Sequence, residues 1–227
     1  MHGSPVLRRV EQRGVVRLVC RGGGTADATN GVWLVAGSPA PLFPDAVTLK
    51  GGVSAGQLVE VLSGRKSCSV KDNYADVDLE PYGFSELFTA QWIGLTTAPT
   101  SSALTGWTHF TERPELESWC AAAELPEVLP VGLMQEPSVR VLGAYRDGRL
   151  AAGAVDNSSD TVVGISNVFQ IGGDSLCVWH EVASVVARFF PGKPVVGYEH
   201  GPDLYAALAA GFSDLGPVRV WLRSPTP

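Results

Sequence analysis

The segment Gln170-Ile171-Gly172-Gly173-Asp174-Ser175 has the residue types of a loop that can hold an anion. An apolar stretch ending at Phe169 precedes it, and apolar residues at helical spacing follow it, which predicts a strand, a loop and a helix. Glycines let a backbone approach a ligand closely, and a helix N-terminus presents unpaired N–H groups and a positive dipole end. Phosphate binding is one interpretation of this loop, and a plain glycine turn is the other.

Two residues capable of acid–base chemistry, Glu199 and His200, follow a predicted strand over Pro194–Tyr198. Open α/β sheets bind ligands at the carboxyl ends of their strands, and the imidazole pKa lies close to neutral pH. Ser166 and Asn167 interrupt an otherwise apolar predicted strand, so we expect one of them to face a cleft. A surface histidine and a solvated carboxylate are the simpler interpretations of the first pair.

The elements that must position these residues follow a regular order in the C-terminal half. Asp147-Gly148 predicts a hairpin turn, and apolar residues at helical spacing predict a helix after the glycine loop. The predicted elements are a helix over Thr111–Ala123 with Thr111 as its N-cap, strands over Val139–Tyr145 and Leu150–Val155, a polar turn over Asp156–Asp160, a strand over Thr161–Phe169, a helix over Leu176–Phe190, a strand over Pro194–Tyr198, a helix over Pro202–Ala210 stopped by Gly211, and a strand over Val218–Leu222.

The N-terminal half has a less regular pattern, and its connection to the second half is a stretch rich in Thr, Ser and Ala over Gly94–Thr105. We therefore predict two parts, residues 1–100 and residues 101–227. The predicted N-terminal elements are strands over Gly14–Cys20 and Val32–Ala36, a glycine-rich loop over Arg21–Asn30, a short apolar stretch over Asp45–Leu49, a helix over Ser54–Leu62 with Ser54 as its N-cap, an extended stretch over Ser67–Leu79, and Phe84–Ile93, which fits a helix or a strand.

Bulk composition excludes several classes of protein. The 227 residues are 45% hydrophobic and 18% charged with a net charge of −6, and without a basic stripe we expect no nucleic-acid partner. The four cysteines are scattered and no zinc pattern occurs, which favours reduced thiols and no metal. No signal peptide or membrane-spanning run is evident, so we expect a cytoplasmic protein without a membrane partner.

The order of strands, hairpin, glycine loop and helices over about Val139–Arg223 resembles the GCN5-related N-acetyltransferase (GNAT) fold, an α/β acyl-CoA N-acyltransferase fold with a mixed sheet. The loop at Gln170 is similar to that family's Q/R-x-x-G-x-G/A motif. The resemblance implies acetyl-CoA or another acyl-CoA as co-substrate. The positions that it assigns to acyl-CoA binding are Asn167, Phe169, Gln170, Gly172, Gly173 and Ser175.

The sequence departs from the family pattern at several positions. Asp174 places a carboxylate beside the expected phosphates, and Ser175 replaces the last small residue of the motif. His200 stands where the family usually has Asn, and Ala207 stands where it usually has a Tyr that acts as general acid. Tyr205, two residues earlier, could replace that acid, although it lies on another face of the predicted helix. Catalytic candidates are therefore His200, Glu199 and Tyr205.

The N-terminal half carries its own Gly-Phe pair, Gly83-Phe84, which echoes Gly211-Phe212 in the family-like half. A truncated first GNAT-like copy would explain this echo, and an unrelated extension packed on the sheet edge is the alternative. The acidic run that includes Asp76, Asp78 and Glu80 alternates like one face of a strand, which is most simply a solvated face.

The resemblance implies an acyltransferase that moves an acyl group to a small-molecule amine or hydroxyl. The departures leave two alternatives open. One is a degenerate GNAT-fold protein that binds ligands or serves as a scaffold without acetyltransferase activity. The other is an enzyme that reuses the fold for decarboxylation or cyclisation of a metabolite. A homodimer stays open as well.

Overall fold

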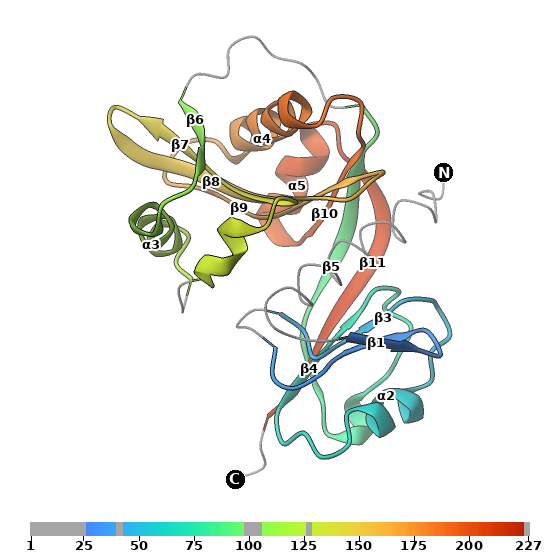
Figure 1. Cartoon of the computed structure of the whole chain (residues 1–227). Helices are drawn as coiled ribbons and strands as arrows, with labels where there is room; N and C mark the ends of the chain where they lie inside the picture. Colours follow the sequence, from blue (N-terminus) through green and yellow to red (C-terminus); the bar gives the residue numbers. More distant parts are fainter. Residues whose placement is uncertain (1–25, 40–42, 98–105, 126–128, 225–227) are drawn as a thin grey trace.

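The computed structural model describes residues 26–39, 43–97, 106–125 and 129–224 (Figure 1). Its strands are β1 (Ala26–Thr29), β2 (Val32–Val35), β3 (Ala46–Thr48), β4 (Cys68–Asp72), β5 (Ser85–Leu95), β6 (Trp107–Phe110), β7 (Val139–Arg146), β8 (Arg149–Ser158), β9 (Val163–Gln170), β10 (Val195–Glu199) and β11 (Ser213–Arg223). Its helices are α2 (Ala55–Val61), α3 (Arg113–Ala122), α4 (Ser175–Phe189) and α5 (Gly201–Ala209), with 3₁₀ turns η1 (Glu80–Tyr82) and η2 (Val131–Gln135).

All eleven described strands belong to one mixed sheet in the order β1-β2-β3-β4-β11-β5-β10-β9-β8-β7-β6. Two neighbouring pairs are parallel, β3–β4 and β9–β10, and the other described pairs are antiparallel. Figure 1 shows two lobes joined by the long strands β5 and β11, which run through both. The mixed α/β architecture confirms the predicted fold class.

The same succession of elements occurs twice along the chain. A hairpin (β1–β2, then β7–β8) leads to a strand, a helix and a parallel strand (β3-α2-β4, then β9-α4-β10). Both hairpin turns, Asn30-Gly31 and Asp147-Gly148, have positive φ at both residues, as a two-residue hairpin turn requires. A Gly-Phe pair then introduces each long strand, β5 or β11. The two halves of the described chain are thus built from one plan.

The two long strands are exchanged between the halves. β11 pairs with β4 of the first half, β5 pairs with β10 of the second half, and β5 and β11 pair with each other. Ser85, the residue after the first Gly-Phe pair, lies opposite Leu222, and Ser213, the residue after the second pair, lies opposite Gly94. These two contacts mark the two ends of an antiparallel pairing with approximate two-fold symmetry. The exchange makes the sheet continuous across the halves.

Helices cover both faces of the C-terminal part of the sheet. Alternate residues of a strand point to opposite faces, and in β8 Ala154 packs with α4 and α5 whereas Val155 packs with α3. Trp179 of α4 contacts Phe212 edge to face, with 5.5 Å between ring centroids. The apolar stripe of α4 is buried against β9 and β10, so packing fixes the helix that follows the glycine loop.

Several local predictions are confirmed. Ser54 caps α2, where its hydroxyl accepts from the backbone N–H of Gln57 and the Gln57 side chain accepts in return. The Asp147-Gly148 hairpin, α4, β10 and α5 also occur where the sequence predicts them. The Phe84–Ile93 stretch resolves as strand β5. The predicted strand over Gly14–Cys20 lies outside the described residues.

Other predictions are wrong at particular residues. Glu112, not Thr111, is the N-cap of α3, because the Glu115 carboxylate accepts from the backbone N–H groups of both residues at 2.9 Å. The polar stretch from Asp156 to Ser158, predicted as a turn, continues β8, since these residues pair with β9. Two strands were not predicted, β6 over Trp107–Phe110 and β1 within the expected glycine-rich loop.

Candidate functional site

The parallel strands β9 and β10 pair at their first residues and then part. Their pairing comprises Val163 with Val195 and Gly164 with Val196. At Gly197 a Cβ atom would lie 2.9 Å from the Ile165 carbonyl oxygen, so glycine permits the close approach at the branching point. Beyond it, β9 continues to Gln170 and β10 to Glu199 without further parallel pairing between them. Past Gly197 the facing edges of β9 and β10 are therefore not joined by strand pairing.

A β-bulge at Asn167 bends β9 at the opening. On β8 the pairing advances from Gly153 to Val155, whereas on β9 it advances from Phe169 to Ser166, so β9 holds one extra residue. Asn167 takes a φ of 51°, a left-handed conformation that Asn tolerates better than most residues. Its side-chain amide donates to the Ser166 hydroxyl at 3.2 Å. The polar pair noticed in the sequence therefore lies where β9 leaves the regular ladder.

The glycine loop follows β9 directly and is held in place by hydrogen bonds. The Ile171 N–H donates to the Ala151 carbonyl at 2.8 Å, which ties the loop to β8. The Gln170 amide donates to the Gly172 carbonyl at 2.5 Å. Gly172 and Gly173 have φ values of 66° and 83°, and a side chain at Gly173 would collide with the Gln170 amide. The loop therefore needs both glycines.

Asp174 is the N-cap of α4. Its carboxylate accepts from the Leu176 N–H at 2.9 Å, and its carbonyl accepts from the Cys177 N–H at 3.0 Å. A local structural role thus explains the carboxylate that departs from the family motif. Ser175 is the first residue of α4 and is half-buried. The N–H groups of Leu176 and Cys177, in the first turn of α4, are therefore already bonded to Asp174. The backbone of Gly172 and Gly173 lies just before this turn.

Glu199 is a half-buried carboxyl group at the end of β10. Burial and, to a smaller extent, the nearby Asp203 carboxylate raise the pKa of Glu199, the His200 backbone N–H opposes them, and the resulting pKa is about 8. A carboxyl group with a pKa near neutral pH can exchange protons under working conditions. Asp203, in the first turn of α5, is a contributor that the sequence analysis missed, because a carboxylate in a first helical turn is an ordinary feature.

His200 occupies the N-cap position of α5 in extended conformation, so it faces the side of the sheet opposite to Glu199. Its exposed imidazole lies against Phe88, with 5.2 Å between ring centroids. On the same sheet face Trp92 contacts Tyr198 edge to face at 5.4 Å, and the ammonium of Lys71 lies over both rings. Strands β4 and β5 of the N-terminal half therefore border the end of β10.

Two predicted site residues lie away from the opening. The Tyr205 side chain is 73% exposed on the outer side of α5, while Ala207 is fully buried under the same helix. The Phe169 ring packs edge to face on Trp119 of α3, with 5.2 Å between centroids, so its side chain belongs to the core. The structure thus places Asn167 and the glycine loop towards the end of β9, and Glu199 and His200 at the end of the neighbouring strand β10, whereas these two side chains lie elsewhere.

Comparisons with known proteins show which fold this geometry belongs to. No protein-family model and no curated protein matches the chain. A GCN5-related N-acetyltransferase from Kribbella flavida superposes with a TM-score of 0.69 at 14% identity, covering 100% of this chain and 97% of its own. A GNAT-family protein from Novosphingobium aromaticivorans superposes with a TM-score of 0.61 at 17% identity over 93% of this chain and 97% of its own. The chain has the GNAT fold.

The GNAT fold here includes both lobes, since the similarity to the Kribbella protein covers the whole chain. A protein of unknown function from Staphylococcus epidermidis shares it with a TM-score of 0.68 at 11% identity, over 90% of this chain and 96% of its own. At such identities the likeness concerns the fold alone.

No described helix combines the length and apolar character needed to cross a bilayer. Within the same residues, His, Cys, Asp and Glu side chains do not gather in threes or more as a metal site would require.

Proposed function

We propose that the protein binds an acyl-CoA in the opening between β9 and β10 and transfers its acyl group to a small-molecule amine or hydroxyl. The observation that carries this proposal is the position of the opening. It lies directly beside a Gly-Gly loop that leads into a fifteen-residue helix. Extended edges suit an amide-containing chain, and a glycine loop before a helix suits phosphates.

The residues present fit such a ligand. The backbone of β9 around Asn167 would pair with the amides of the pantetheine arm, as an added strand does. The N–H groups of Gly172, Gly173 and Ser175 would hold phosphate oxygens, since glycine leaves the backbone open to a ligand. Gln170 keeps the loop in shape through its bond to the Gly172 carbonyl. When bound, acyl-CoA supplies the thioester that is attacked.

Glu199 is our candidate for the group that accepts a proton from the acceptor. Its carboxylate, once ionised, can take the proton that an amine or hydroxyl loses as it attacks. With a pKa of about 8, Glu199 is mostly protonated at neutral pH, and it ionises as the pH rises through 8. The acceptor would reach past the end of β10 from Glu199 to His200, which lies on the other sheet face beside Phe88. Tyr205 is outside the proposal because its side chain points into solvent.

One set of observations favours a second candidate, a protein that binds a ligand without acyl transfer. Ala207 is buried and offers no hydroxyl where the family's usual acid would stand. Asp174 also adds a negative charge beside the loop. In our proposal Glu199 takes the proton that the acceptor loses and returns it to the departing CoA thiolate, so transfer needs no such hydroxyl, which is why we favour transfer.

Calorimetric titration with acetyl-CoA, followed by turnover assays on a panel of amines and alcohols, separates the candidates. We expect saturable binding to the wild type and to Gly192→Trp, a left-handed glycine in an open turn after α4. Gly173→Trp should abolish binding because the new side chain collides with Gln170 and fills the loop. Absence of wild-type binding would sink the proposal. Binding without turnover would favour the second candidate.

A further inference from the structure

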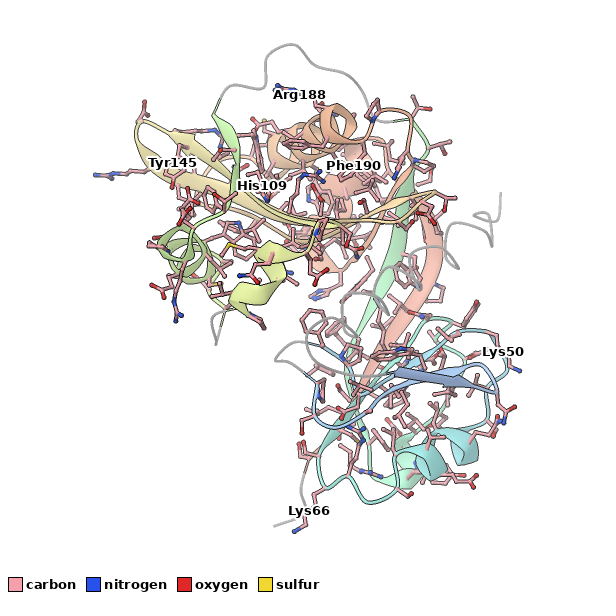
Figure 2. The ribbon with its side chains drawn as sticks, in the orientation of Figure 1. Lys50, Lys66, His109, Tyr145, Arg188 and Phe190 are labelled. Carbon is pink, nitrogen blue, oxygen red and sulfur yellow. The ribbon has the colours of Figure 1, made fainter. Side chains whose placement is uncertain are left out.

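The N-terminal half contains a counterpart of the opening between β9 and β10. β3 and β4 are also parallel and pair through only two residues each, Ala46 with Val70 and Val47 with Lys71. Between them lie a Gly-Gly loop, Gly51-Gly52, and α2. Figure 2 labels Lys50, which precedes this loop and projects outward at the edge of the N-terminal lobe. The counterpart has the same parts in the same order as the C-terminal site.

At the position in the N-terminal half that corresponds to the opening between β9 and β10, polar side chains join β3 and β4. The Thr48 hydroxyl donates to the Asp72 carboxylate at 3.2 Å and accepts from the Asn73 N–H at 2.9 Å. The Asn73 side-chain amide donates to the Thr48 carbonyl at 2.7 Å. These three residues are buried. Their hydrogen bonds continue the contact between the strands beyond the ladder, so the strand edges are already paired.

The segment after β4 also returns over the Gly-Gly loop. Ala75 takes a positive φ of 51°, which turns the chain back. The Asp76 carboxylate then accepts from the Gly52 N–H at 2.8 Å. A Cβ atom at Gly51 would lie 3.2 Å from this carboxylate and 3.6 Å from the Tyr74 ring. The chain's own carboxylate therefore takes the glycine N–H that an anion would use.

A buried carboxylate anchors this returning segment. Asp72 accepts from the Val77 N–H at 2.9 Å and from the Tyr74 N–H at 3.2 Å. In the C-terminal half the chain instead passes from Glu199 through His200 directly into α5. The C-terminal loop differs as well, because Asp174 bonds a helix N–H and not a glycine N–H.

We infer that the N-terminal half is a second copy of the ligand-binding module whose cleft is closed by residues 72–77, so that the chain binds one acyl-CoA, in its C-terminal half. The statement on stoichiometry rests on the proposed function. The statement on closure does not, because it concerns hydrogen bonds within the free protein. Asp76, predicted from the sequence as part of a solvated face, closes the cleft together with the buried Asp72.

Hydrogen–deuterium exchange of the full chain tests both statements. In the free wild type we expect slow exchange at the amides of Asn73 and Val77, as in β4 itself. Thr48→Val removes the hydroxyl acceptor of the Asn73 N–H and should speed its exchange by roughly fivefold. Thr89→Val, the same change at an exposed position of β5, should leave it unaltered. Rapid exchange at Asn73 and Val77 in the wild type would overturn the closure.

Addition of acetyl-CoA gives the second readout. We expect new protection over residues 166–176 and none over residues 49–54, with one equivalent bound. Protection over residues 49–54, or two equivalents, would overturn the inference. If acetyl-CoA protects no segment, the proposed function fails, while exchange at Asn73 and Val77 still decides the closure. Asp76→Ala, compared with Asp78→Ala, provides a second pair of variants, because only Asp76 bonds the Gly-Gly loop.

Discussion

The ring of Phe88 lies against the imidazole of His200, with 5.2 Å between their centroids and 37° between their planes. Phe88 belongs to β5, which the N-terminal half contributes, and His200 ends β10 of the C-terminal half. The exchanged strand thus brings a side chain from residues before 100 to the mouth of the proposed site. Neither half alone contains this contact.

Phe88→Ala should weaken use of the acceptor without affecting acyl-CoA. The ring both borders the proposed acceptor side and orients His200, and aromatic contacts of this kind are worth about 0.5–1.5 kcal/mol. We expect the KM for the acceptor to rise about two- to tenfold while the Kd for acetyl-CoA stays unchanged. Leu87→Ala, an exposed neighbour on the other sheet face, is the matched control. Equal effects of both variants would argue against an acceptor role for Phe88.

Asp203→Asn should shift the pH profile of acyl transfer to lower pH. The Asp203 carboxylate raises the pKa of Glu199, which stands at about 8, so removing its charge lowers that pKa. The acidic limb of the pH profile of kcat/KM should therefore move to lower pH, while the limb that comes from the acceptor's own titration stays in place. Glu199→Gln should lower kcat strongly and remove the limb that depends on Asp203. An unshifted profile would show that Glu199 does not carry the proton.

Asp174→Asn should tighten acyl-CoA binding without loss of helix capping. Asn caps helices about as well as Asp, so stability should stay the same. Removal of one negative charge near the phosphates should lower the Kd roughly fivefold at low salt, with a smaller gain at high salt. Asp174→Ala separates the two effects, because it also loses the cap at a cost of about 1 kcal/mol. Weaker binding by Asp174→Asn would place the phosphates elsewhere.

Fold stability should fall as pH rises from about 4 to about 7 because of Asp156. Its carboxyl group is fully buried, and Arg140, which lies on the Phe190 ring, approaches it only to 3.6 Å (Figure 2 labels Phe190). Burial raises the pKa of Asp156, the Arg140 charge partly opposes this, and the resulting pKa is about 7. A folded-state pKa above the unfolded value gives stability that is present at low pH and lost towards pH 7, at most about 1.4 kcal/mol per pH unit.

The check for Asp156 is a set of urea unfolding curves at pH 5, 6, 7 and 8. Asp156→Asn lacks this titration, so the unfolding free energy of the wild type minus that of the variant should fall as pH rises to about 7 and then level off. The exposed Asp160→Asn should keep the slope of the wild type. A difference that is constant with pH would mean that Asp156 is ionised throughout this range.

Local patterns sufficed to predict the elements that contain the site. The Asp147-Gly148 turn, the Ser54 cap and the apolar stripe of α4 depend on neighbouring residues, which is why the sequence alone predicts them. The loop at Gly172-Gly173 could likewise be recognised from its residue types. The GNAT resemblance of the C-terminal half followed from these local signals in their order.

Features that depend on distant pairing could not be predicted. The extra residue at Asn167 is defined only against β8, and the place of β5 between β10 and β11 depends on contacts across the whole chain. Asp156 reads as a turn residue because it is polar, yet strand pairing buries it. Asp72 is likewise buried, and its three hydrogen-bond donors are visible only in the folded chain.

The most direct test of the central claim is a crystal structure of the full chain with bound acetyl-CoA or CoA. The account predicts continuous density for the pantetheine arm between Asn167 of β9 and Glu199 of β10, with the pyrophosphate at the Gly172-Gly173 loop and nothing bound at Gly51-Gly52. A ligand that lies elsewhere, with the opening between β9 and β10 empty, would contradict it.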